Sequence, residues 1–126
     1  MAGPLSTFDL LRQAAKKGDA EKQYELGYAY DVGGKGATQS FTKAVKWYRL
    51  AATQGHPKAQ FNLGVCYDNG QGVAQSDADG VKWYRLAAAQ DHAPAQFNLG
   101  VCYMHGQGVT QSDADALKWY LVMVCS

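Results

Sequence analysis

Three histidines and three cysteines are the side chains whose chemistry best suits metal binding, nucleophilic catalysis or redox exchange. They are His56, His92, His105, Cys66, Cys102 and Cys125. The histidines are spread along the chain with no matching carboxylate or thiol cluster, so the spacing of a zinc site is missing. No Ser/His/Asp or Cys/His set recurs, and the glycine-rich turns lack the lysine and serine or threonine of a phosphate loop. The sequence therefore predicts no catalytic residue, no metal site and no cofactor.

The cysteines fit the interior of the protein better than a redox site. Cys66 and Cys102 occupy the same place in two copies of a repeated segment. Equivalent points on stacked helices lie about 8–10 Å apart, whereas disulfide partners need Cα atoms closer than about 7 Å. We therefore expect the three cysteines to be small buried apolar residues, and an odd cysteine total suits a reducing compartment.

Composition and charge argue against several classes of protein. The chain has 126 residues, of which 47% are apolar and 18% charged, so we expect one folded domain. A formal net charge of +1 without a basic run argues against nucleic-acid binding. No apolar segment reaches the length of about 18 residues that a membrane span needs. The first residues lack the pattern of a secretory signal, so a cytoplasmic location is the default expectation.

Three near-copies of one unit account for most of the chain. The segment AQFNLGVCY occurs at Ala59–Tyr67 and again at Ala95–Tyr103, and EKQYELGYAY at Glu21–Tyr30 is a diverged copy. Each segment is followed by a glycine-rich turn and then by a Lys-Trp-Tyr triplet. The tryptophans of the triplets are Trp47, Trp83 and Trp119. The first turn carries one additional residue near Gly34.

Each unit is predicted to form two helices, called here the A helix and the B helix. In the second unit Ala59, Leu63 and Tyr67 lie four residues apart, which predicts one buried face on the A helix. The B helix has the same three-and-four spacing at Val81, Tyr84, Ala87 and Ala88. Glycine inside a helix costs about 1 kcal/mol, so the recurring glycine beside the leucine, as at Gly64, predicts close approach of a neighbouring helix.

Capping residues indicate where these helices begin and end. Starts are expected at Ser76 with Asp79, at Ser112 with Asp115, and near Pro57 and Pro94. Gly55 is expected to end one B helix in a left-handed conformation. A solitary B helix from Leu5 to Lys17, ended by Gly18, precedes the first full unit.

These elements predict about seven helices in a single repeat domain spanning residues 1–126. The leading helix takes residues 5–18, and the three units take residues 19–54, 55–90 and 91–126. One pair of helices cannot bury both of its faces, so neighbouring units must supply the core.

The pattern A-x-x-x-L-G-x-x-Y, then G-x-G-V, then A-x-x-W-Y-x-x-A-A resembles the Sel-1-like repeat, a relative of the tetratricopeptide repeat, over residues 5–125. In the second unit it is carried by Ala59, Leu63, Gly64, Tyr67, Gly70, Gly72, Val73, Trp83, Tyr84, Ala87 and Ala88. The resemblance implies an all-α fold, a right-handed α-solenoid of stacked antiparallel helix pairs whose A helices line a concave face. It also implies a scaffold that holds other proteins or peptides and has no chemistry of its own.

Two departures from the family pattern are visible. Gly80 stands where Ala44 and Ala116 sit, which is a tolerable change. Secreted bacterial members carry paired cysteines in each repeat, and these pairs are absent. Some bacterial members have been associated with penicillin binding and β-lactam hydrolysis, so a β-lactam-binding or β-lactam-hydrolysing enzyme is an alternative function, although no serine-lysine motif is present.

The outward positions of the A helices are the predicted partner-binding residues, by helical geometry and by resemblance to the tetratricopeptide groove. They are Tyr24, Tyr28, Lys58, Phe61, Asn62, Val65, Asp68, Asn69, Phe97, Asn98, Val101, Met104 and His105. The two asparagines can form two-sided hydrogen bonds with a peptide backbone, and the aromatic rings supply apolar contact. The alternative for the phenylalanines, and less strongly for the asparagines, is that they fill the core between repeats.

The tryptophans, lysines and inter-unit histidines are predicted to have structural roles. Recurrence at one repeat position favours packing for the tryptophans. The neighbouring lysines Lys46, Lys82 and Lys118 are expected to form a solvated row. His56 and His92 occupy equivalent turns between units and suit helix capping.

The final helix breaks the repeat. Met123 replaces Ala51 and Ala87, whose small side chains let the next A helix approach. Solenoid ends usually need a polar face, and exposed apolar patches indicate a partner surface. We therefore expect either self-association as a homodimer or packing back onto the stack, through Leu121, Val122, Met123 and Val124. A truncated tail with an unnatural sequence is the rival explanation.

The leading prediction for function is a non-catalytic protein-protein interaction scaffold with a peptide or partner protein in the concave groove. The alternatives are the β-lactam enzyme and a structural module that self-associates through its apolar last helix.

Overall fold

The structure is a computed structural model that describes residues 3–125 of the chain. Its helices are α1 (Thr7–Lys16), α2 (Ala20–Val32), α3 (Phe41–Thr53), α4 (Pro57–Asn69), α5 (Asp77–Ala88), α6 (Ala93–His105) and α7 (Asp113–Cys125). Over residues 3–125 there are seven helices and no strand, which confirms the all-α prediction.

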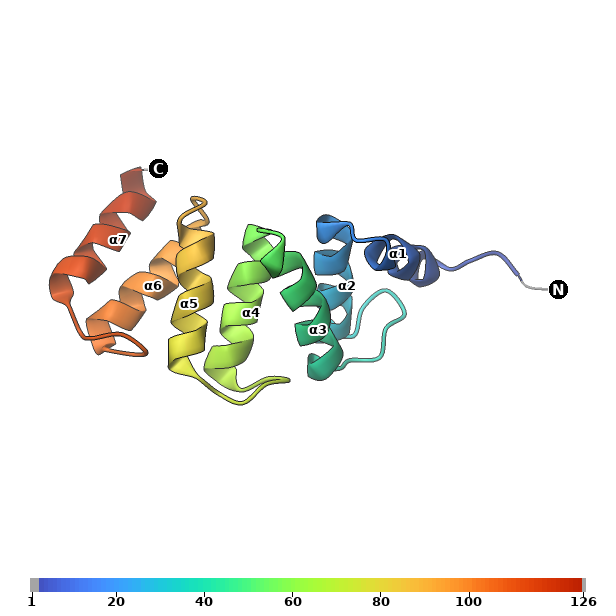
Figure 1. Cartoon of the computed structure of the whole chain (residues 1–126), viewed down its shortest axis with the longest axis horizontal. Helices are drawn as coiled ribbons and strands as arrows, with labels where there is room; N and C mark the ends of the chain where they lie inside the picture. Colours follow the sequence, from blue (N-terminus) through green and yellow to red (C-terminus); the bar gives the residue numbers. More distant parts are fainter. Residues whose placement is uncertain (1–2, 126) are drawn as a thin grey trace.

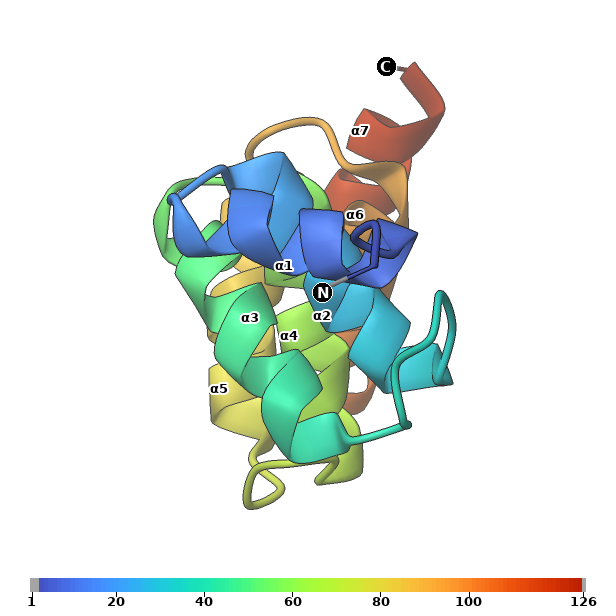
Figure 2. The ribbon, with the colours of Figure 1, turned by 90° about the vertical axis from the view of Figure 1, so that its right-hand side faces the viewer.

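The helices follow one another along an elongated stack that has α1 at one end and α7 at the other (Figure 1). The pairs α2–α3, α4–α5 and α6–α7 form the three units, and α4 and α6 also pack on the B helices of the preceding units. Viewed along the stack, the units lie behind one another (Figure 2). This arrangement is an α-solenoid.

Helix caps explain the observed boundaries. The leading helix is shorter than the predicted Leu5–Lys17 because Ser6 and Asp9 form a capping box that starts it at Thr7. Serine side chains also accept from backbone amides at the starts of later B helices, as predicted; the distances are 3.2 Å for Ser76 with Asp79 and 3.1 Å for Ser112 with Asp115. Gly55 follows α3 with a φ of +93°, which confirms its role as a terminator.

The glycine beside the A-helix leucine makes room for a tyrosine of the B helix. A β-carbon on Gly64 would lie 2.7 Å from the Tyr84 ring and 3.2 Å from the carbonyl oxygen of Gly80. Gly27 and Gly100 face B-helix tyrosines in the same way. The predicted close approach of a helix is correct, but a side-chain ring rather than the backbone makes the nearest contact.

The glycine-rich turns pack against the preceding unit. Gly72 has a φ of +74°, and a β-carbon there would lie 2.5 Å from the carbonyl oxygen of Phe41, at the start of α3. Gly108 approaches the carbonyl of Asp77 in the same manner. The first turn, residues 33–40, is one residue longer than the turns at 70–76 and 106–112, as predicted.

The residues predicted to be structural occupy the interior or its edge. Trp47 and Trp83 are buried and Trp119 is half-buried. The row of Lys46, Lys82 and Lys118 is exposed as predicted, and the ammonium groups of Lys46 and Lys82 also lie over the adjacent tryptophan rings, at 5.2 and 5.5 Å. Neighbouring residues on a helix point in different directions, yet cation–π attraction brings each of these two lysine ammonium groups over the tryptophan ring beside it.

Cys66 and Cys102 are buried and not disulfide-bonded, as expected, whereas the burial predicted for Cys125 is wrong, because it lies exposed at the end of α7. Burial raises the pKa of their thiols to about 12 and about 11, so neither is a thiolate near neutral pH. Within residues 3–125 no three histidine, cysteine or acidic side chains gather as metal ligands would. None of the helices in this part of the chain is long and apolar enough to span a membrane.

Candidate partner-binding surface

Aromatic side chains at one A-helix position form a row along the three units. They are Tyr24, Phe61 and Phe97, each two residues before the buried leucine. Each ring packs against the B-helix tyrosine of its own unit, with centroid separations of 6.1 Å for Tyr24–Tyr48, 5.7 Å for Phe61–Tyr84 and 6.0 Å for Phe97–Tyr120. In every unit, one side of the ring in this row therefore packs on the B helix.

Two of these rings, Tyr24 and Phe61, also pack against a histidine of the following unit. His56 stacks on Tyr24 with ring centroids 4.9 Å apart, and His92 packs on Phe61 at 5.1 Å. Phe61 is consequently half-buried, whereas Phe97 is exposed and has no imidazole over it among residues 3–125. The two predicted roles of the phenylalanines thus divide: Phe61 helps to fill the space between units, and Phe97 presents its ring.

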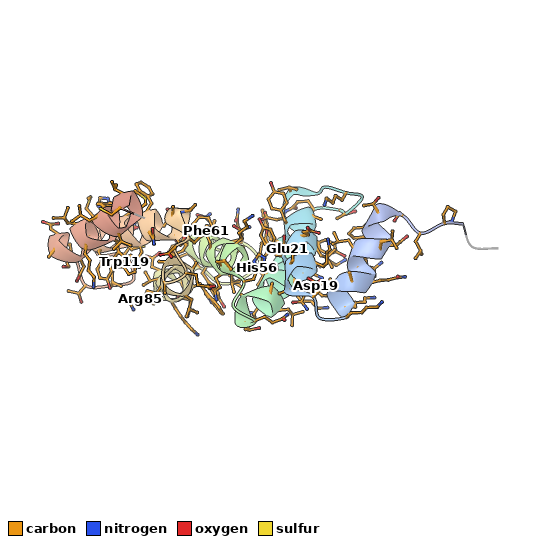
Figure 3. The ribbon with its side chains drawn as sticks, turned by 90° about the horizontal axis from the view of Figure 1, so that it is seen from above. Asp19, Glu21, His56, Phe61, Arg85 and Trp119 are labelled. Carbon is orange, nitrogen blue, oxygen red and sulfur yellow. The ribbon has the colours of Figure 1, made fainter. Side chains whose placement is uncertain are left out.

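The same histidines cap A helices, as predicted. Nδ1 of His56 accepts a hydrogen bond from the amide of Ala59 at 3.2 Å, and Nδ1 of His92 accepts from Ala95 at 3.4 Å. An accepting Nδ1 leaves the proton of a neutral ring on Nε2. In His56, Nε2–H then donates to the Glu21 carboxylate at 2.5 Å (Figure 3).

Acid is expected to weaken the His92 cap. Burial, aided by the positive charge of Lys58, lowers the pKa of His92 from its ordinary 6.5. The unfolded chain therefore binds a proton at His92 before the folded chain does, and stability falls as pH drops below about 6.5.

A His92→Asn variant keeps a capping acceptor without titrating. We expect the urea midpoint to fall less between pH 7.5 and 5.5 in this variant than in the wild type; equal falls would contradict the prediction. Other titrating groups, including Asp68 with its raised pKa, are common to both proteins and cancel.

The two predicted asparagines lie beside tyrosine hydroxyls. The side chain of Asn62 lies near the hydroxyls of Tyr24 and Tyr48, and the side chain of Asn98 lies near the hydroxyl of Tyr84. Burial raises the pKa of all three phenols, while the asparagine amides act in the opposite direction. Both asparagines are half-buried, so part of each side chain lies inside the stack.

Asp68 lies between an A helix and a B helix. Its carboxylate accepts a hydrogen bond from the Tyr84 hydroxyl at 2.6 Å, and Gly80 leaves room for it where a β-carbon would overlap. Asp31 accepts from Tyr48 at 2.8 Å in the same way. Burial is the main cause of a raised pKa at Asp68. These contacts give Asp68 a role in holding the two helices together.

The other predicted A-helix residues divide by exposure. Tyr28, Lys58, Asn69, Met104 and His105 are exposed, and Val65 and Val101 are half-buried. The apolar members and the aromatic row occupy positions four or seven residues apart on the A helices, which lie on one side of a helix, and we call this set the A-helix face. It consists of Tyr24, Tyr28, Phe61, Val65, Phe97, Val101 and Met104.

Two features of this region were missed from the sequence. A pocket of about 130 Å³ is lined by Tyr24, Glu25, Tyr28, Ala29, Val32, Gly34 and Lys35. The additional residue near Gly34 was the signal for it, because Gly34 and Lys35 of the lengthened turn form part of the lining. The second feature is a set of buried glutamines, Gln23, Gln60 and Gln96, whose side-chain amides donate to the carbonyls of Ala15, Ala52 and Ala88. Their recurrence in the repeat was the available signal.

The residues predicted to mediate self-association lie on α7, at the far end of the stack from α1 (Figure 1). Leu121 and Val124 are exposed, while Val122 and Met123 are half-buried. They do not belong to the A-helix face.

Comparison with known proteins identifies the repeat. The model of the family described as "Sel1 repeat" matches residues 6–19, 21–56, 57–92 and 93–121. The solved structure of a Sel1 repeat protein from Oxalobacter formigenes is 33% identical, covers 99% of this chain and 98% of that chain, and superimposes with a TM-score of 0.88.

Two further matches are to longer proteins. The structure of c5321, a protective antigen of uropathogenic Escherichia coli strains with an SLR fold, is 41% identical with a TM-score of 0.89, over 95% of this chain and 26% of that one. The ERAD-associated E3 ubiquitin-protein ligase component HRD3A of Arabidopsis thaliana is 35% identical over 65 residues, which are 52% of this chain and 10% of that protein. This chain therefore spans only a small part of that curated relative.

Proposed function

Since this chain belongs to the Sel1 repeat family, we propose that it is a non-catalytic scaffold that binds a peptide or a segment of a partner protein on its A-helix face. Sel1 repeat proteins generally mediate protein–protein interactions. The relative HRD3A is by name a component of a ubiquitin-ligase assembly, which is in keeping with such a role.

Exposed aromatic and methionine side chains on the A helices carry the proposal. Tyr28 and Met104 are exposed, and Phe97 keeps 49% of its surface in solvent although its ring is anchored on Tyr120. Aromatic residues and methionine are enriched at protein interfaces, and aromatic rings dominate their energetics. Asn98, half-buried beside Phe97, offers an amide whose donors and acceptor suit a peptide backbone.

A double variant tests this assignment. We expect Phe97→Ser with Met104→Ser to weaken binding of a partner captured by the wild-type chain at least about tenfold, because two apolar anchors are lost. Dissociation constants would be measured by titration calorimetry with the purified partner, and circular dichroism would show that the variant remains folded.

Leu86→Ser is the matched control, because Leu86 is 44% exposed but lies on a B helix. It is expected to leave the affinity unchanged. The proposal fails if the double variant binds as tightly as the wild type, or if the Leu86 variant loses as much affinity.

A further inference from the structure

The pocket beside the first A helix is built from one short segment of the chain. All of its lining residues lie between Tyr24 and Lys35, on α2 and in the turn that follows it, so its walls come from within the first unit. Its volume of about 130 Å³ is close to that of a cavity of about 150 Å³ that can hold benzene. The rings of Tyr24 and Tyr28, with centroids 6.4 Å apart, form part of the wall. The pocket therefore has the size and the lining for one aromatic side chain.

The turn that closes this pocket differs from the other two glycine-rich turns by one added residue, which is Lys35. Gly34 is equivalent to Gln71 and Gln107 of the later turns, because the amide of each donates at 2.9 Å to an A-helix carbonyl five residues earlier. In the later turns a left-handed glycine comes next, whereas in the first turn Lys35 precedes that glycine. Figure 2 shows the first turn standing clear of the helices beside α2.

The backbone does not require glycine at position 34. The φ of Gly34 lies outside the left-handed region, and an added β-carbon would meet only the Val32 side chain within 4 Å, at 3.4 Å. The later turns carry glutamine at the equivalent position, so this place in the turn accepts a long side chain. Gly34 and Val32 both line the pocket. What the glycine provides is therefore open space in the pocket.

Lysine at position 35, in contrast, is poorly suited to the backbone. The φ of Lys35 is +57° and that of Gly36 is +92°, and the Ala37 amide donates to the Gly34 carbonyl at 3.0 Å. Positive φ at both central residues is the pattern of a type I′ turn, which favours asparagine, aspartate or glycine at the first of them. Residues held in such conformations cluster at functional sites, where the side chain rather than the backbone is needed.

The charge of Lys35 has no partner in the part of the chain that the structure describes. Its side chain is exposed and forms no ion pair within residues 3–125. Glu25 is the one acidic residue among those that line the pocket, and its carboxylate is already paired with Lys22 at 3.2 Å. The rim therefore presents one uncompensated positive charge beside an apolar pocket.

We propose that this pocket binds an aromatic side chain of the partner segment, and that Lys35 pairs with an acidic residue next to it in that segment. The inference rests on the proposed function, because Tyr24 and Tyr28 belong to the A-helix face, and it adds the class of residue that the first unit selects. Burial of the ring supplies affinity, and the charge supplies preference among sequences.

Three eight-residue peptides with blocked ends and glycine-serine flanks serve as probes. The first has phenylalanine followed by two glutamates at its centre. The second replaces the phenylalanine by serine, and the third replaces both glutamates by lysine. Each is titrated into the full-length ¹⁵N-labelled chain, and amide shifts are followed by NMR.

The phenylalanine-glutamate peptide is expected to shift the amides of residues 24–35. It should bind at least about tenfold more tightly than the serine peptide, which buries no ring. It should bind about fivefold more tightly than the lysine peptide, which is the effect of one exposed ion pair.

Lys35→Gly tests the charge and the backbone together. Its affinity for the phenylalanine-glutamate peptide should fall about fivefold, and the preference over the lysine peptide should disappear. The urea midpoint of unfolding should rise at the same time, because glycine adopts the left-handed conformation freely. Lys118→Gln removes the same charge from an exposed position on α7 and should leave both the affinity and the preference unchanged.

Gly34→Gln tests the space in the pocket. It supplies the side chain that the later turns carry, so the chain should remain folded by circular dichroism. The glutamine should occupy the pocket and weaken binding of the phenylalanine-glutamate peptide about tenfold, because the ring is then excluded.

The proposal is overturned if the phenylalanine-glutamate peptide binds no more tightly than the serine peptide, or if its shifts lie outside residues 24–35. It is also overturned if Lys35→Gly keeps the preference for glutamate or lowers the urea midpoint, or if Gly34→Gln binds as tightly as the wild type. Phe97 and Met104 do not line the pocket, so the double variant described above tests the proposed function separately. If that variant weakens partner binding while these peptides fail, only the pocket assignment is wrong.

Discussion

A Gly72→Ala variant is expected to lose about 3 kcal/mol in free energy of unfolding, although Gly72 is exposed. Two costs combine at this position. The φ of +74° costs a residue with a β-carbon about 1–2 kcal/mol. The β-carbon would also lie 2.5 Å from the carbonyl oxygen of Phe41, and overpacking of this kind costs about 1–3 kcal/mol. Because the contact joins two units, the loss should appear in the global unfolding transition.

Gly55→Ala separates the two costs. Gly55 has a φ of +93°, but a β-carbon there would meet nothing within 4 Å. This variant should lose only the conformational part, about 1–2 kcal/mol. Urea denaturation of the wild type and both variants gives the comparison. Equal losses at the two positions would show that the contact between the turn and α3 contributes little.

Repeated local signals made the fold predictable. The serine caps and the prolines specify helix starts through contacts within a few residues, and the leucine–glycine pairs mark the A helix of every unit; only the prolines are confined to the second and third units. Only the exact boundaries moved, as at Ser6, where the capping box excludes Leu5 from the helix. The right number of helices follows because each unit carries its own start and stop signals.

The environment of the candidate site could not be read locally, and the repeat itself shows why. Phe61 and Phe97 lie in identical nine-residue segments, yet one is half-buried and the other exposed. The difference comes from His92, which covers Phe61 from the next unit. Likewise Gln60 has a side-chain partner in Gln90, whereas Oε1 of Gln96 has none among residues 3–125. The surroundings of Gln60 and Phe61 are therefore set by residues about 30 positions further along the chain.

Asp68 shows a second limit of sequence reasoning. Its place on the A helix predicted an outward side chain. Instead, its carboxylate accepts a hydrogen bond from the Tyr84 hydroxyl, and Gly80, which has no β-carbon, leaves room for it between the helices. The pairing of aspartate with tyrosine recurs at Asp31 and Tyr48, and that recurrence was a usable signal. In the third unit Met104 replaces the aspartate, so the repeat position carries an apolar exposed residue there.

Gly64→Ala is the second variant with a large expected effect, about 2–3 kcal/mol lost in free energy of unfolding. The added methyl group would meet the Tyr84 ring at 2.7 Å and the carbonyl of Gly80 at 3.2 Å. Tyr84 is almost fully buried, so its ring has little freedom to move aside. Alanine is the better helix former by about 1 kcal/mol, and this intrinsic gain is expected to be outweighed. Urea denaturation measures the net change.

The equivalent pair Gly100 and Tyr120 shows whether the ring is the cause. There the nearest atoms to an added β-carbon all belong to Tyr120, which is only half-buried, so the ring can be removed without unfolding the chain. Gly100→Ala should be destabilising in the wild type and neutral or stabilising in a Tyr120→Leu background, where the helix preference for alanine of about 1 kcal/mol remains. If Gly100→Ala costs the same in both backgrounds, the glycine is required by the backbone of the helix pair and the tyrosine contact is incidental.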